Sequence, residues 1–185
     1  MKLAEFRDNC FRTWKRDETE NDLIINLLHA NIGITSETNE LETALITKDK
    51  VNISEELADK LYYLCVYLTY RGIPLDDYEK ILNQYRSHLS INPEASLSNM
   101  YRTNSLLSDI VKKMCFYLKE PDYKKEEDLL KLYFYYIAEV FCYFHIDWDT
   151  ATTKLIAKLR VRFPDKFTFD NANNRDLESE YSALS

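Results

Sequence analysis

The chain has 185 residues with 31 acidic and 24 basic side chains, and its formal net charge is −7 at pH 7. This length allows a real hydrophobic core in one domain, or in two small halves packed together. The negative charge argues against a general nucleic-acid binder, although a local basic patch stays open. No stretch of about 18 apolar residues offers a membrane span.

Cysteine usage and the first residues indicate a cytoplasmic protein. The sequence holds four cysteines that lie far apart and form no C-x-x-C pair: Cys10, Cys65, Cys115 and Cys142. We expect reduced thiols and no zinc site. The first ten residues, MKLAEFRDNC, lack the long apolar run of a signal peptide.

Helical patterns dominate the chain. Only two glycines and four prolines are present, a composition typical of long helices joined by short polar connections. The expected fold class is therefore all-α. In chain order, the predicted helices cover residues 3–15, 22–31, 37–46, 54–71, 75–89, 99–119, 126–145 and 147–162.

Glycine, proline and capping residues set the expected boundaries. Gly33 is expected to break the chain between the second and third helices, and Ser54 to cap the next helix. Gly72 fits the position just after a helix end. Residues 91–99 are the expected linker, and Pro164 is expected to stop the last helix and leave an extended polar tail.

Two acidic pairs carry the functional interpretation. Glu37 and Glu40, then Glu56 and Asp59, are each spaced i, i+3, so each pair would lie on one face of its helix. Two such faces turned toward each other would gather four carboxylates, which repel unless a cation lies between them. Such hard oxygen ligands favour Mg²⁺, with Mn²⁺ as the alternative, and Mg²⁺ commonly also binds substrate phosphates. The competing interpretation is two solvated helix surfaces.

Tyr63 follows the second acidic pair on a neighbouring face of the 54–71 helix, beside a core stripe of leucines. Its ring could flank a nucleobase. The alternative is a core tyrosine with a satisfied hydroxyl.

The stretches LLHANIGITSETNEL and NISEELADKLYYL resemble the MazG-like family of all-α nucleoside triphosphate pyrophosphohydrolases, which carries an E-x-x-E pair and an E-x-x-D pair on consecutive helices. Residues 41–55 separate the two pairs here, a separation typical of the family. KLRVRFPDKFTFDNANNRDLESE, residues 158–180, is similar to the C-terminal segment of phage and bacterial members, and FRTW at 11–14 is similar to their first helix. The resemblance implies a four-helix bundle core.

The resemblance also implies roles for the acidic pairs. Glu37, Glu40, Glu56 and Asp59 would hold one or two Mg²⁺ ions on the triphosphate, and Glu37 or Glu40 would take the proton from the attacking water. Some family members carry an additional Glu just before the first pair. Ser36 stands there in this sequence, which leaves a dedicated general base open.

Cationic side chains are needed for the triphosphate, because no glycine-rich phosphate loop is present. Asn83 and Arg86 stand where the family places an N-x-x-K/R pair that contacts substrate. Lys158 and Arg162 belong to a second such segment, in which Leu155 replaces the family's Asn. The alternative for this segment is a solvated helix C-terminus, where basic residues are favoured.

A degenerate repeat is a further hypothesis. A shift of 73 residues, which takes Gly72 to His145, also takes Glu56 to Leu129 and Asp59 to Leu132. The halves would be a metal-site half, 1–90, and a second half without ligands, 99–162, followed by a polar tail, 163–185. The related dimeric dUTPases hold such a degenerate half within one chain. The alternative is that any two helical pairs look alike at this level.

The sequence thus predicts Mg²⁺-dependent hydrolysis of nucleoside triphosphates to a monophosphate and pyrophosphate, with a dUTPase-like preference as a variant. The rival is a catalytically inactive helical module that binds a nucleotide or a protein. A nucleoside triphosphate is the expected partner, without nucleic acid or membrane, and a homodimer is left open. The expected setting is the cytoplasm of a bacterium or a phage-infected cell.

Overall fold

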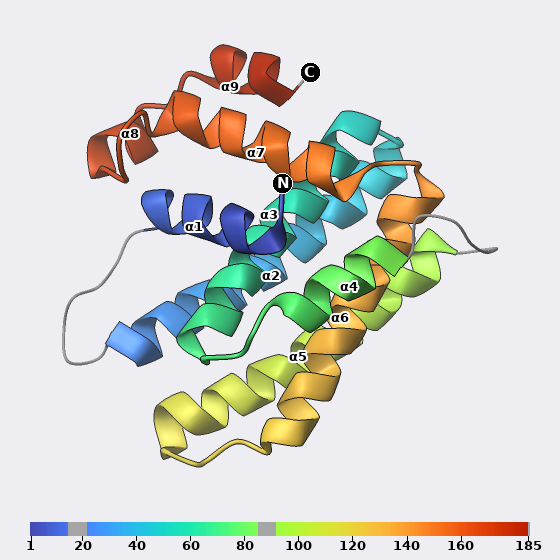
Figure 1. Cartoon of the computed structure of the whole chain (residues 1–185), viewed down its shortest axis with the longest axis vertical. Coiled ribbons are helices and arrows are strands. Elements are labelled where there is room, and N and C mark those ends of the chain that lie inside the picture. The colour runs from blue at the N-terminus through green and yellow to red at the C-terminus, as the bar shows by residue number, and fades with distance from the viewer. Residues whose placement is uncertain (15–21, 85–91, 185) are drawn as a thin grey trace.

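The computed structural model describes residues 1–14, 22–84 and 92–184, and everything in this described part is helical or loop (Figure 1). The prediction of an all-α fold is confirmed. The helices are α1 (Leu3–Thr13), α2 (Asp22–Thr47), α3 (Lys50–Tyr70), α4 (Asp76–Gln84), α5 (Pro93–Tyr117), α6 (Tyr123–Tyr143), α7 (Trp148–Arg162), α8 (Phe169–Asn173) and α9 (Leu177–Leu184).

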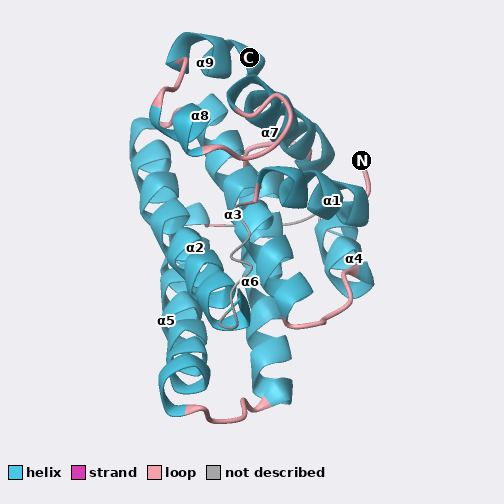
Figure 2. Ribbon diagram, turned by 90° about the vertical axis from the view of Figure 1, so that its left-hand side faces the viewer, coloured by secondary structure: helices cyan, strands magenta, loops and turns pink. Residues whose placement is uncertain are grey.

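Four long helices form the bundle core. α2 packs along α3, α5 packs along α6, and α2 also lies against α5 (Figure 2). Their apolar faces meet in one continuous cluster of buried side chains, as amphipathic helices require. None of the helices in the described residues is long and apolar enough to cross a membrane.

Two of the shorter helices, α4 and α7, each pack on the other half of the chain. α4 follows α3 but packs on α6, whereas α7 follows α6 but packs on α3 and α1. The first half therefore covers α6 with its α4, and the second half covers α3 with its α7. This exchange brings residues near the C-terminus against the helix that carries Glu56 and Asp59.

The ends of α3 and α6 have the same local geometry at a spacing of 73 residues. Gly72 has φ 66° and His145 has φ 50°. In both places the next N–H, of Ile73 or Ile146, donates to the carbonyl five residues earlier at 2.9 Å. This correspondence supports the proposal of a degenerate repeat over an accidental likeness.

Helix starts add to that correspondence and correct one boundary. Asp49 caps α3 by accepting from the N–H groups of Val51 and Asn52, and Asp122, 73 residues on, caps α6. The prediction of Ser54 as the cap was wrong, because Asp49 caps the helix five residues earlier.

Gly33 does not break the chain as predicted, since α2 runs through it without interruption. A Cβ atom at Gly33 would lie 2.3 Å from the ring of Tyr63. Glycine here therefore lets α2 and α3 approach closely instead of ending a helix, and this contact outweighs its low helix propensity.

Two other expectations fail near the ends of helices. Asn92 caps α5, so the residues from Pro93 to 99 of the predicted linker are helical, while 85–91 lie outside the described residues. The tail after Pro164 is not extended, because it forms α8 and α9, and α9 packs on α7.

We expect Gly33→Ala to destabilise the protein although alanine favours a helix. The gain in helix propensity is about 1 kcal/mol, whereas forcing the Tyr63 ring aside costs about 1–3 kcal/mol. Ile32→Ala is the matched control, since Ile32 is 64% exposed on the same helix. Urea unfolding measures both variants. A Gly33→Ala protein at least as stable as Ile32→Ala would contradict the close approach.

Candidate metal centre

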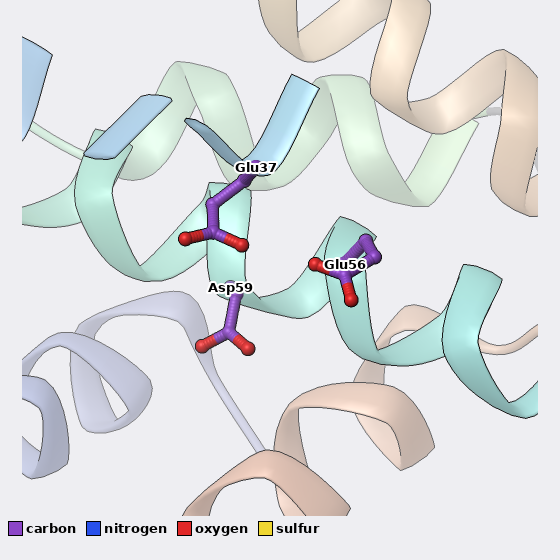
Figure 3. Close-up of side chains that lie close together, drawn as sticks. All are labelled: Glu37, Glu56 and Asp59. Carbon is purple, nitrogen blue, oxygen red and sulfur yellow. The ribbon is translucent and has the colours of Figure 1, made fainter. Parts of the chain in front are cut away.

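Three carboxylates from two helices meet in one place. Glu37 comes from α2, and Glu56 and Asp59 lie one turn apart on α3 (Figure 3). One oxygen of each lies within 4.8 Å of the others. The i, i+3 spacing on α3 and the close packing of α2 on α3 together produce this cluster.

Glu40, the fourth predicted ligand, lies at the rim of the same cavity. It is exposed and falls outside the group of three. The structure therefore brings three of the four predicted carboxylates together, and the fourth faces the space beside them.

Burial makes this cluster costly without a cation. Burial and then the charge of Asp59 raise the pKa of Glu37 to about 7. Burial, and then the hydrogen bond with Glu37, raise the pKa of Glu56 further. Glu56 Oε2 is buried and has no hydrogen-bond partner within the described residues.

These features fit a hard divalent ion. The donors are oxygens only, and an unpartnered buried carboxylate oxygen lacks the partner that a bound cation would provide. Glu37, Glu56 and Asp59 would hold Mg²⁺ or Mn²⁺ here, with Glu40 within the same cavity.

Lys60 was missed by the sequence analysis. Its side chain is fully buried, and Nζ donates to Thr38 Oγ1 at 2.6 Å. Burial lowers the pKa of Lys60 to about 7, although Glu37 and Glu56 act in the opposite direction. The signal in the sequence was a lysine within the apolar run LADKLYYL, on the core side of the helix.

A cavity of about 330 Å³ surrounds the carboxylates. Its size suits a small-molecule ligand. Besides the acidic side chains, it is lined by aromatic side chains, Trp14, His29, Tyr62, Tyr63, Phe163 and Phe167, and by basic ones, Lys158, Arg162 and Arg175.

Lys158 is tied to the acidic cluster. Its Nζ donates to Glu55 Oε1 and to Asp59 Oδ2, both at 2.8 Å. This contact exists because α7 crosses onto α3. Lys158 thus orients one metal ligand, a role that the sequence analysis did not give it, and Glu55 joins the site as its second acceptor.

Tyr63 and Arg162 both line the cavity, as predicted substrate contacts should. Tyr63 is half-buried and packs edge-on against Trp14, with ring centroids 6.0 Å apart. Trp14 in turn stacks on His29 at 4.1 Å. These three rings contact one another, and a planar ligand would find stacking partners beside them.

Asn83 has no place in this cavity. It is exposed on α4, which packs on α6, and its Oδ1 accepts a hydrogen bond from Trp148 Nε1 at 3.2 Å. The prediction that Asn83 contacts substrate is therefore not supported by its position, because α4 crosses to the half without ligands. Arg86 lies outside the described residues.

Comparison with known proteins adds one family. Residues 27–86 match the model of the phosphoribosyl-ATP pyrophosphohydrolase family, a stretch that contains both acidic pairs. Neither the comparison with curated proteins nor that with solved structures gives a match. The family match supports a pyrophosphohydrolase acting on a nucleotide-like substrate. The matched family belongs to the MazG-like superfamily of all-α nucleoside triphosphate pyrophosphohydrolases, and the residues of this chain that match it include the three clustered carboxylates.

Proposed function

We propose that this protein hydrolyses nucleoside triphosphates between the α- and β-phosphates, in a Mg²⁺-dependent reaction that releases a nucleoside monophosphate and pyrophosphate. One observation carries the proposal: three carboxylates from consecutive family-typical helices converge within 4.8 Å in a cavity that also holds basic and aromatic side chains.

The position of each side chain indicates its role in the reaction. Glu37, Glu56 and Asp59 would hold the ion, and Lys158 keeps Asp59 in place by donating a hydrogen bond to its Oδ2. Bound Mg²⁺ neutralises phosphate charge and lowers the pKa of a coordinated water. The nucleobase would lie against Tyr63 and Trp14, where the aromatic rings gather.

Glu40 is the candidate general base. It faces the cavity but is exposed and stands outside the tight group of three. A carboxylate that is not committed to the ion could take a proton from an attacking water. Glu37 belongs to the group of three that would hold the ion, so it is less suited to that task.

Phosphoribosyl-ATP is a second candidate substrate, favoured by the family match over residues 27–86. It carries the same triphosphate, so the cleaved bond and the metal requirement would be unchanged. What differs is the group beyond the base, which would have to fit beside the aromatic end of the cavity.

The substrate panel is the first test. We expect purified protein with Mg²⁺ to release pyrophosphate and monophosphate from at least one of the (d)NTPs, dUTP included, or from phosphoribosyl-ATP. Products are separated by anion-exchange chromatography. Stepwise release of single phosphates through a diphosphate would contradict cleavage at the α-phosphorus. If none of them is hydrolysed, the proposed activity is contradicted and the alternative of a catalytically inactive binding module is favoured.

Glu56→Gln and Asp59→Asn should each lower hydrolysis by about a hundredfold or more, because each removes a charged ligand from the ion. The helical fold should persist, and Glu56→Gln should raise the melting temperature without metal by removing repulsion. Glu42→Gln is the control, since Glu42 is exposed on α2 and bonds Tyr101 outside the cavity. Activity of Asp59→Asn close to that of Glu42→Gln would contradict the assignment of Asp59 as a metal ligand.

Protons should compete with the metal at Glu37. Its pKa is raised to about 7 from 4.5, so the folded metal-free protein keeps a proton that the unfolded chain loses. The free energy of unfolding without metal should therefore fall as pH rises through this window, while Mg²⁺ affinity should increase.

Calorimetric titration of Mg²⁺ at about pH 5.5 and about pH 7.5 measures this competition, with proton release read from buffers of different ionisation enthalpy. Glu37→Gln should flatten the pH dependence of unfolding. Equal Mg²⁺ affinity at both pH values would show that the buried carboxylates do not bind the ion.

A further inference from the structure

Two arginines reach the cavity from outside the α2–α3 pair. Arg162 ends α7, and Arg175 lies in the loop between α8 and α9. Arg175 belongs to the segment after Pro164, which was expected to be an extended polar tail and was given no residue that contacts substrate. The structure instead folds this segment back so that part of it lines the cavity.

A single buried carboxylate holds both arginines. Arg162 donates from Nε and Nη2 to the two oxygens of Glu180, at 3.0 and 2.5 Å. Arg175 donates from the same two nitrogens to the same two oxygens, at 3.3 and 2.7 Å. Glu180 is only 2% exposed. The guanidinium groups are therefore fixed by one edge each.

Glu180 remains ionised in this position. Burial alone would raise its pKa, but the hydrogen bonds from Arg162 and Arg175 outweigh burial and lower the pKa to about 2. The trio thus carries two positive charges and one negative charge. Its surplus is one positive charge at the wall of the cavity.

The free edges of the arginines remain available. Within the described residues, neither Arg162 nor Arg175 has a hydrogen-bond partner at Nη1. An orienting carboxylate lowers the entropy that a guanidinium loses on binding, and planar N–H donors match phosphate oxygens.

Lys158, the other cation of the cavity, is already compensated. It lies between Glu55 and Asp59 and is committed to both. The arginine pair therefore keeps one positive charge that its own carboxylate, Glu180, does not balance, and it lies on elements other than those that carry Glu37, Glu56 and Asp59.

We propose that Arg162 and Arg175, oriented by Glu180, form a phosphate subsite for the terminal phosphates of the substrate, the part that leaves as pyrophosphate. This inference rests on the proposed function and extends it, because it gives Arg175 a ligand and Glu180 a positioning role. It makes the folded-back C-terminal segment a working part of the site.

Inorganic pyrophosphate with Mg²⁺ is the probe, and isothermal titration calorimetry on the full chain is the measurement. Arg175→Gln should weaken pyrophosphate binding about tenfold, because one charge-assisted bidentate contact is lost. Lys166→Gln is the matched control. Lys166 is exposed in the same segment and does not line the cavity, so removing its charge should change affinity by about twofold at most.

Arg175→Lys separates orientation from charge. It keeps a cation beside Glu180 but lacks the planar fork, so we expect an affinity between those of the wild type and Arg175→Gln. Arg175→Lys also replaces Arg175→Gln as the test variant if the glutamine releases α9 from α7. Circular dichroism would report that release as a loss of helix. Wild-type affinity in a folded Arg175→Gln protein, or in Arg175→Lys if that variant alone keeps α9, overturns the subsite.

The two proposals can fail separately. Pyrophosphate binding that depends on Arg175, in a protein that hydrolyses no nucleotide, keeps the subsite and removes the proposed activity. Nucleotide hydrolysis by the wild type, with pyrophosphate affinity unchanged in Arg175→Gln, keeps the activity and removes the subsite.

Discussion

The repulsion among three closely grouped carboxylates, of which Glu56 is buried and the other two are half-buried, is the constraint on which this structure depends. Glu37, Glu56 and Asp59 lie within 4.8 Å of one another between two tightly packed helices. In that environment their charges are stabilised only by protons, by cations of the chain or by a bound metal. Lys60 is buried on α3, where its charge interacts with Glu37 and Glu56, and Lys158 donates to Asp59 from α7. The rest of the bundle keeps those two lysines in position.

The acidic site could be predicted from sequence because its geometry is local. The i, i+3 spacing fixes Glu56 and Asp59 on one face of a helix, and a short connection forces the preceding helix to lie alongside. The spacing does not predict the rotation of α2 about its own axis. This rotation decides that Glu37 enters the cluster and Glu40 stays at the rim. That rotation is set by core packing, which no spacing rule describes.

Non-local contacts account for most of the errors. Gly33 was read as a helix breaker because its neighbour Tyr63 lies on another helix and thirty residues away. Asn83 was placed at the substrate because nothing in its own segment shows that α4 crosses onto α6. The C-terminal segment was expected to be extended, since its helices are short, and α9 packs on α7 through distant contacts such as the one between Glu180 and Arg162. In each case the deciding partner is distant in sequence.

The crossing of α7 onto α3 also sets an order of events during synthesis. Asp59 and Lys158 are separated by 99 residues, so the helix with the carboxylates leaves the ribosome long before its counter-cation exists. During that interval the nascent α2–α3 pair holds its acidic cluster without the lysine of α7 and without the cover that α7 provides. Contacts of such long sequence separation form late in folding. The half of the chain that carries the acidic cluster is therefore made first and completed last.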